Sequence, residues 1–163
     1  MKYTPNQINK WMLFKLPAAW LTGVRISSIS DTKCEVKVRF KWINQNPYRS
    51  MFWAVQGMAA ELTTGMLLTK SIQESNTNIS MLLIGNKSNF YKKAVGKIKF
   101  ICDQGDIAKE LIDSTKKNIT HKAWLKAKGF DETGDVVSEF DFEWSCKKLS
   151  LIHISEPTRR RGI

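Results

Sequence analysis

The sequence predicts an α+β domain in which a curled antiparallel sheet wraps around one long central helix. Short segments with alternating apolar and polar residues occur on both sides of a long apolar stretch, at about residues 50–70. Strands and helices do not alternate regularly, so a parallel doubly wound sheet is disfavoured. A chain of 163 residues favours one domain. Such a small domain buries an apolar helix only if its sheet curls over that helix.

A capping pattern opens the first predicted helix. Thr4 and Gln7 have the spacing of a capping box, and Pro5 stands at the first helical position. We expect a helix over about residues 5–15. The apolar residues on one side of it are Ile8, Trp11, Met12 and Leu16. This helix either packs over the domain's own sheet or lies on a membrane, because it carries aromatic residues and two lysines.

Regular alternation marks the strongest predicted strand, over residues 34–42. Apolar side chains point to one face and charged side chains to the other, which is typical of a half-buried antiparallel strand. Residues 21–29 are its expected hairpin partner. The apolar face consists of Cys34, Val36, Val38, Phe40 and Trp42.

Further strands and one short helix are expected after the central helix. A bulge is expected at Gly85, because glycine inside a strand favours one. The expected strands cover residues 79–91, 97–102, 119–130 and 135–146, and the expected helix covers residues 106–117.

The acidic residues of the last predicted strand are interpreted as sheet surface. A tight turn at residues 131–134 places opposite charges face to face across the final hairpin. Such cross-strand pairing accounts for these acids without a catalytic role. The expected pairs are Lys126 with Glu139, Trp124 with Asp141, and Lys122 with Glu143.

Charge and cysteine content limit the possible functions. The formal net charge is +11, which suits nucleic acid, an anionic membrane or an anionic small ligand. Lysines are spread along predicted strands and no nucleic-acid-binding motif occurs, so no nucleic-acid partner is expected. The three cysteines lack the spacing of a zinc site or a disulfide framework. We therefore expect no metal site, and buried thiols in a reducing compartment.

The termini and the apolar stretch favour a cytoplasmic protein. The first residues lack an uninterrupted apolar run and a cleavage site, so no signal peptide is expected. The apolar region at residues 51–68 contains Gln56 and Glu61 and is too polar for a membrane span. We expect no stable membrane insertion.

The last residues differ in character from the rest of the chain. Residues 149–163, LSLIHISEPTRRRGI, resemble translated sequencing-adapter read-through. The single domain is therefore assigned to residues 1–148, and the tail is treated as non-native. A genuine disordered basic tail is the alternative.

One carboxylate, Glu61, lies in the middle of the predicted central helix. A helix that is apolar all round is normally buried, and burial of a lone charge is unfavourable. A role for Glu61 in chemistry or in an ion pair would explain why it stands there.

The layout resembles the hotdog fold of the acyl-CoA thioesterase superfamily. Many hotdog thioesterases of the phenylacetate-pathway type have an Asn-rich loop, then His-Gly-Gly, then an acidic residue nine positions after that His. Here Phe52-Trp53-Ala54 stands in place of His-Gly-Gly, and Glu61 lies nine residues beyond Phe52. Among the branches of this superfamily, the chain is most similar to the uncharacterised DUF4442 group.

The resemblance implies an acyl-CoA or a related thioester as substrate, with coenzyme A present only as part of it. Glu61 would then act as general base or nucleophile. A backbone N–H at the helix start, near Phe52 and Trp53, would polarise the thioester carbonyl. Asn46 and Gln56 are candidates for substrate hydrogen bonds.

The resemblance also implies an oligomer, because the acid and the N–H commonly come from different subunits. A homodimer or a dimer of dimers is therefore expected. The candidates for contact with the phosphates of coenzyme A are Lys92, Lys93 and Lys97.

Three interpretations of the function stay open. Phe52 and Trp53 are bulky where the family pattern has His and Gly, which favours a non-catalytic module that binds acyl groups or acyl-CoA. Glu61 would in that case pair with a cation or a tyrosine across a dimer interface. A membrane-surface or nucleic-acid partner attracted by the net charge is the third interpretation, and it lacks a motif.

Overall fold

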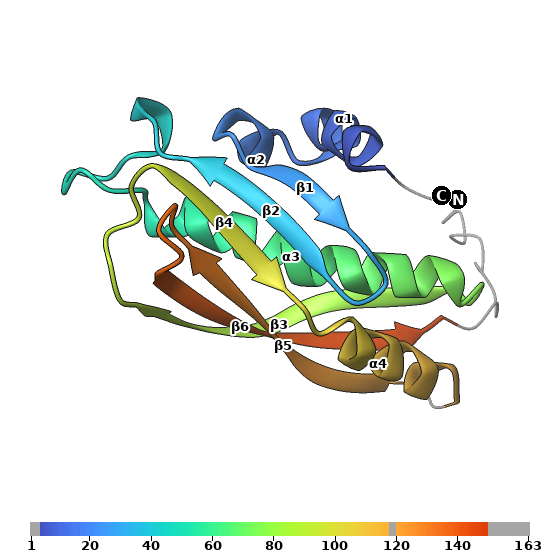
Figure 1. Cartoon of the computed structure of the whole chain (residues 1–163). Helices are drawn as coiled ribbons and strands as arrows, with labels where there is room; N and C mark the ends of the chain where they lie inside the picture. The colour runs from blue at the N-terminus through green and yellow to red at the C-terminus, as the bar shows by residue number, and fades with distance from the viewer. Residues whose placement is uncertain (1–3, 118–119, 150–163) are drawn as a thin grey trace, which may run out of the picture.

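A computed structural model describes residues 4–117 and 120–149, and it has one antiparallel sheet wrapped around a long helix (Figure 1). The strand order is β1-β2-β4-β5-β6-β3. The helices are α1 (Pro5–Lys15), α2 (Pro17–Leu21), the 3-10 turn η1 (Trp42–Asn44), α3 (Trp53–Glu74) and α4 (Gly105–Lys117). The strands are β1 (Arg25–Ile29), β2 (Cys34–Arg39), β3 (Ile79–Phe90), β4 (Lys97–Cys102), β5 (Thr120–Phe130) and β6 (Val136–Lys148).

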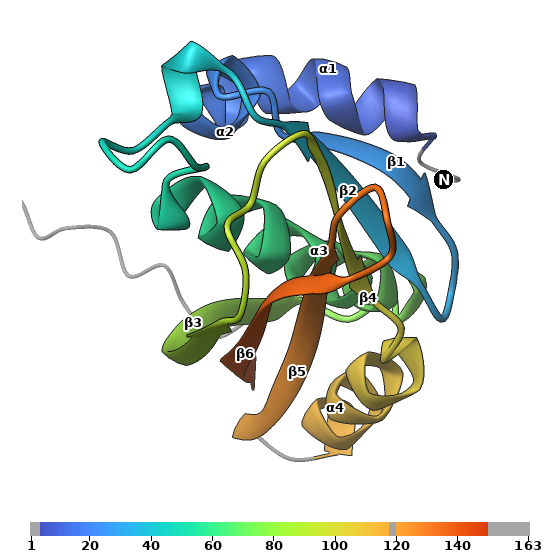
Figure 2. The ribbon, with the colours of Figure 1, turned by 60° about the vertical axis from the view of Figure 1, so that its left-hand side comes forward.

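This arrangement confirms the expected α+β hotdog architecture. Figure 2 shows α3 in the hollow of the sheet, with α1 and α2 along one border and α4 at the opposite end. None of the helices in the described parts of the chain is long and apolar enough to cross a membrane. Apart from Leu149, the tail expected at residues 149–163 lies outside the described residues.

The central helix α3 has about the expected length, but it begins and ends about three residues later than expected. Met51 still belongs to the loop, where it forms a bridge with Gln45, and Phe52 is the N-cap residue. One side of α3 packs on the sheet, and a fully buried leucine there contributes about 2 kcal/mol to stability. The buried apolar residues of α3 are Val55, Ala59, Ala60, Leu62, Leu67 and Leu68.

Close packing explains a glycine inside this helix. A Cβ atom added to Gly65 would lie 3.4 Å from the ring of Trp144 on β6. The indole N–H of Trp144 donates a hydrogen bond to the hydroxyl oxygen of Thr64, at 3.1 Å. The glycine therefore lets α3 approach an aromatic side chain of the sheet.

The N-terminal helix α1 has the expected bounds, and its capping box at Thr4 and Gln7 is formed. Ile8 and Met12 are buried in the core. The Asn9 side chain exchanges two hydrogen bonds, each 2.9 Å long, with the backbone of Ile26 on β1. The helix is thus held on the domain itself, as one of the two expectations had it.

The expectation that Trp42 faces the core is wrong. Strand β2 ends at Arg39, and Trp42 lies in η1 with 83% of its surface exposed. Asn44 causes the change of direction, because its buried side chain accepts a hydrogen bond from the Lys41 N–H, at 2.8 Å, and donates one to the Arg39 carbonyl, at 2.9 Å. These bonds close a turn where the alternation alone predicted a continuing strand.

The expected register of the final hairpin is wrong by two residues. Lys126 pairs with Asp141, and Trp124 pairs with Glu143. The reason is a bulge near Gly129, together with a turn in which Asp131 accepts hydrogen bonds from backbone N–H groups. A shift of two residues keeps every side chain on its expected face.

Strand β3 forms one edge of the sheet and pairs with β6 alone. The expected bulge at Gly85 is present, because the register shifts between Leu83 and Gly85. Large apolar side chains of this strand are exposed, among them Leu82 and Ile84. A long edge strand with such residues is a surface on which another chain can pair.

Candidate functional site

Glu61 lies near the middle of α3. Its carboxylate is half-buried and has no hydrogen-bond or ion-pair partner within the described residues. Burial raises the pKa of the Glu61 carboxyl above its ordinary value. A carboxylate of this kind has lost part of its hydration without gaining a cation in exchange.

Glu61 lines a cavity of about 370 Å³. The cavity lies between α3, the junction of α1 with α2, and the strands β3 and β6, and apolar side chains make up most of its wall. A volume of this size is near the lower end of small-molecule sites. The lining residues include Trp11, Lys15, Leu16, Met58, Glu61, Met66, Met81 and Trp144.

The N-terminus of α3 carries unused hydrogen-bond donors. The Phe52 N–H donates to the carbonyl of Asn44, at 2.8 Å, and no side chain caps the helix. The backbone N–H groups of Trp53 and Ala54 have no acceptor among the residues that the structure describes. They point along the axis at the positive end of the helix dipole, which favours negative charge.

The acid and these donors are far apart within one chain. Trp53 and Glu61 are eight residues apart on a straight helix, which corresponds to roughly 12 Å along its axis. A small ligand group bound at the Trp53 N–H therefore lies well away from Glu61 of the same chain.

Asn46 and Gln56 use their polar atoms within the chain. The Asn46 side-chain oxygen accepts hydrogen bonds from the N–H groups of Tyr48 and Ser50. The buried Gln56 donates to the carbonyl of Met51, at 3.2 Å, and accepts from the hydroxyl of Ser138, at 2.9 Å. Both side chains hold the loop and the helix start in position.

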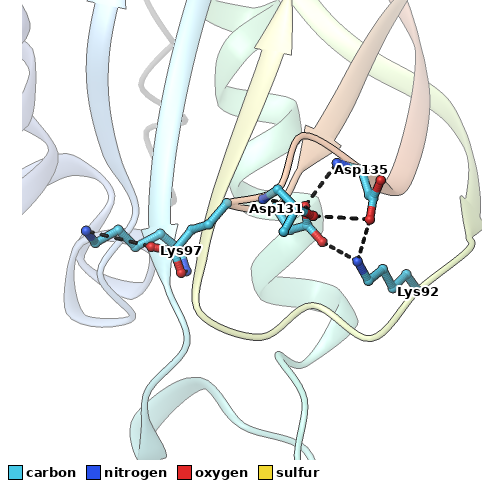
Figure 3. A network of polar contacts seen from close by, with 6 residues as sticks. Lys92, Lys97, Asp131 and Asp135 are labelled. Carbon is cyan, nitrogen blue, oxygen red and sulfur yellow. Dashed lines mark hydrogen bonds and ion pairs between the residues drawn. The ribbon is translucent and has the colours of Figure 1, made fainter.

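Two of the three candidate lysines, Lys92 and Lys97, have acidic partners (Figure 3). Lys92 lies 2.6 Å from the carboxylate of Asp131 and 2.7 Å from that of Asp135, and it holds the pKa of both carboxyls below their usual range. Lys97 lies 3.8 Å from Glu132. The positive charges of these two lysines are therefore largely compensated.

Lys93 has a different environment. Its ammonium group donates a hydrogen bond to the backbone carbonyl of Tyr48, at 3.2 Å, and it forms no ion pair with a described residue. The adjacent Ala94 carbonyl accepts from the Met51 N–H, at 2.8 Å. Lys93 is thus an uncompensated cation beside the loop that leads into α3.

Sequence patterns missed two parts of this site. Asn44 carries no motif, yet its buried amide donates to the Thr22 carbonyl, at 3.0 Å, and its own carbonyl binds the Phe52 N–H. Lys15 and its neighbours at the α1–α2 junction form the wall opposite Glu61. Only the tertiary fold brings these segments to the helix, so no local signal could reveal them.

The described cysteine and histidine side chains lie outside this site. Cys34, Cys102 and Cys146 are buried and free, and burial raises the pKa of the Cys34 thiol to about 12. The half-buried His121 lies on β5. Among residues 4–117 and 120–149, no cluster of three or more potential metal ligands occurs.

Comparison with known proteins places the chain in a family. The family model described as a domain of unknown function, DUF4442, matches residues 5–146. No curated protein matches the chain.

Several solved structures have the same fold. A Pseudomonas aeruginosa protein described as of unknown function and "Probable Thioesterase" has 18% identity and a TM-score of 0.77, over 90% of this chain and 97% of that chain. A thioesterase from Haemophilus influenzae has 11% identity and a TM-score of 0.69, over 94% of this chain and 97% of that chain. At such identities the likeness concerns the fold. The match over residues 5–146 shows that the chain belongs to the DUF4442 family.

Proposed function

We propose that this protein hydrolyses an acyl-CoA or a related thioester, with Glu61 as the catalytic acid–base group. The observation that carries the proposal is the half-buried, unpaired carboxylate of Glu61, a residue that lines a largely apolar cavity. The apolar wall suits an acyl group. Burial raises the pKa of Glu61 towards the range in which a carboxylate is an effective base at neutral pH.

The proposed reaction begins with a water molecule beside the Glu61 carboxylate. The carboxylate accepts a proton from this water as the water oxygen bonds to the thioester carbonyl carbon. The backbone N–H at Trp53 donates to the carbonyl oxygen as negative charge develops on it. The carbon–sulfur bond then breaks, the thiolate of coenzyme A takes up the proton, and a carboxylic acid is released.

A homodimer completes the site in this proposal. The roughly 12 Å between Trp53 and Glu61 of one chain is too long for one reaction centre. A second copy can supply the missing half, and the exposed edge strand β3 offers a surface for it. The expected unit is therefore a dimer, or a pair of such dimers.

A second candidate function is binding without cleavage. The rings of Phe52 and Trp53 lie edge to face with their centres 5.9 Å apart, at the very start of α3. Bulky side chains at this point can cover the N–H groups and keep a thioester carbonyl away from them. The protein would then hold an acyl or acyl-CoA group as a carrier or sensor.

Thiol release from a series of acyl-CoAs separates these functions. The wild-type protein is expected to turn over at least one chain length, and Glu61→Gln should lower kcat by about 100-fold or more, the usual contribution of a general base. Glu74→Gln is the matched control, because Glu74 lies on the same helix but pairs with Lys70 at 2.7 Å.

Calorimetric binding of the same acyl-CoAs decides the remaining outcomes. Saturable binding without turnover in the wild-type protein contradicts hydrolysis and supports the binding module. Turnover that Glu61→Gln leaves unchanged contradicts the role of Glu61. Absence of both binding and turnover contradicts both candidate functions.

A further inference from the structure

The charge of the chain is unevenly distributed along the sequence. Residues 4–30 and 36–60 contain no aspartate or glutamate, although the whole chain has 15 acidic residues. These two segments therefore carry positive charge that no acid within them compensates. Their basic residues are Lys10, Lys15, Arg25, Lys37, Arg39, Lys41 and Arg49.

The same two segments carry large apolar side chains that are highly exposed to solvent. Trp42 on η1 is 83% exposed, Phe14 on α1 is 78% exposed, and Leu21 on α2 is 60% exposed. Ile43, next to Trp42, is also exposed. None of these side chains packs in the core of the domain. The helix α1 contacts the domain through the side that carries Ile8 and Met12.

These three elements are neighbours in space. In both Figure 1 and Figure 2, α1, α2 and η1 lie along the same border of the molecule, at the far end from α4. The Asn44 amide of η1 donates to the carbonyl of Thr22, the residue that follows α2. We call the exposed side chains Phe14, Leu21, Trp42, Lys10 and Lys41 of these neighbouring elements the basic aromatic face.

The chemistry of this face suits one kind of partner. Aromatic side chains that lie among lysines are typical of proteins bound at the boundary between lipid headgroups and acyl chains. The lysines attract anionic headgroups, and long aliphatic and aromatic side chains enter the acyl region. Nucleic acid would use the positive charge but would leave Phe14 and Leu21 without a partner.

A second copy of the chain is a poor occupant of this face. A symmetric contact would bring the lysines of both copies together, and neither segment offers an acidic residue to pair with them. A bilayer with anionic lipids compensates this charge and covers the apolar side chains at the same time.

We propose that α1, α2 and η1 form a docking surface for an anionic lipid bilayer. Phe14, Leu21 and Trp42 enter the headgroup boundary, and Lys10 and Lys41 contact the negatively charged headgroups. This is peripheral binding, without a membrane-spanning segment. It stands independently of thioester hydrolysis, because none of these apolar side chains lines the cavity beside Glu61.

Co-sedimentation with lipid vesicles tests the proposal. The full chain is expected to bind vesicles of phosphatidylcholine mixed with phosphatidylglycerol, and to bind pure phosphatidylcholine vesicles much more weakly. Added salt should weaken the binding, because it screens the lysines. The double variant Phe14→Ser, Trp42→Ser should lower the partition coefficient about tenfold or more.

Matched controls lie on α4, at the far end of the domain. Ile107 and Lys109 are exposed there, so Ile107→Ser and Lys109→Glu change the same side-chain types away from the basic aromatic face. These variants should bind vesicles like the wild-type protein. Equal loss in both sets of variants would overturn the proposal, as would equal binding to neutral and anionic vesicles.

Two further measurements keep the test decisive. The variant Lys10→Glu, Lys41→Glu reverses two charges and leaves the apolar side chains in place, and it should also lose vesicle binding. It tests the proposal even if the double serine variant fails to fold. Analytical ultracentrifugation reports whether Phe14→Ser, Trp42→Ser changes the oligomeric state. Such a change would assign the face to an interface between copies and overturn the proposal, as would tight duplex DNA binding lost in the same variants.

Discussion

At the scale of single residues, burial of the Glu61 carboxylate lowers the stability of the folded protein at neutral pH, whereas the proposed function depends on this burial. The Glu61 carboxyl has a raised pKa because burial removes water from it, and it forms no ion pair with a cation in the part of the chain that the structure describes. The folded protein therefore binds a proton more tightly at Glu61 than the unfolded chain does. Stability from this group is fully present below the unfolded pKa and is lost as pH rises through the folded pKa.

This linkage predicts a stability gain from Glu61→Gln at neutral pH. The amide has the same shape and avoids burial of a charge, so the variant should have the higher Tm. The gain should shrink in acid below about 4.3, the ordinary pKa of glutamate, where both states are protonated. Thermal unfolding followed by circular dichroism across pH measures the difference. A lower Tm for the variant at neutral pH would reveal a hidden stabilising partner of Glu61.

Lys93 gives a second prediction at the same scale. Among the three candidate lysines it is the one without an acidic partner in the described residues, so it has positive charge available for a phosphate. Lys93→Ala should raise the KM for an active acyl-CoA about twofold to fivefold, as expected for an exposed charge contact. It should leave kcat nearly unchanged.

Two comparisons make the Lys93 measurement specific. Lys92→Ala should change KM little, because Lys92 is already paired with Asp131 and Asp135. A short thioester without phosphates should be hydrolysed equally by the wild-type protein and Lys93→Ala. If this short substrate loses as much as acyl-CoA, Lys93 does not act through the phosphates.

At the scale of elements, α4 depends on a close approach between two backbones. A Cβ added to Gly105 would lie 2.1 Å from the carbonyl oxygen of Asp31 and 2.4 Å from the Cα of Thr32. The Gly105 N–H also donates to the Thr32 carbonyl, at 3.0 Å. The first residue of α4 is thus pressed against the turn between β1 and β2.

The contact predicts a large effect of a small substitution. Gly105→Ala should lower the free energy of unfolding by about 2 kcal/mol or more, because backbone atoms must move apart to admit the methyl group. Ser114→Ala, later in the same helix, should be nearly neutral. Urea unfolding measures both variants. An unchanged midpoint for Gly105→Ala would show that the two backbones move apart without a loss in the free energy of unfolding.

Local signals predicted many of the elements correctly. The capping box set the start of α1, and alternation set β4 at its observed bounds, because both depend on residues close in sequence. The existence of α3 was clear from its apolar length. The short helix α2 was missed, although Pro17 stands at its first position, where proline is favoured.

The errors came from tertiary hydrogen bonds. Trp42 continued a regular alternation, but Asn44 turns the chain through bonds to Arg39 and Thr22. The hairpin register depended on the conformation of a turn that Asp131 organises. Glu61 was identified from the sequence, whereas the wall of its cavity comes from α1 and β3, which are remote in sequence.

At the scale of the whole molecule, one protomer has an exposed sheet edge, and the proposed function divides the reaction site between two copies. Strand β3 is twelve residues long, pairs on one side only, and exposes Leu82 and Ile84. We interpret this edge as the place where a second copy completes the site. The basic aromatic face lies on α1, α2 and η1, outside this edge strand.

The proposed dimer implies that assembly and activity are lost together. Leu82→Lys puts a charge on the exposed edge and should shift the protein towards monomers, with loss of thioester turnover in proportion to the monomer fraction. Lys122→Ala, an exposed position on β5, is the control. Ultracentrifugation and turnover on the same samples measure the two effects. Full activity in a monomeric variant would contradict a site shared between subunits.

The most direct measurement of the central claim is a crystal structure with an acyl-CoA analogue in which a methylene group replaces the sulfur. The account predicts the analogue's carbonyl oxygen about 3 Å from the Trp53 N–H of one chain, with its carbonyl carbon facing the Glu61 carboxylate of the second chain. An analogue bound away from Glu61, or a Glu61 carboxylate paired with a cation of the second chain, would contradict it.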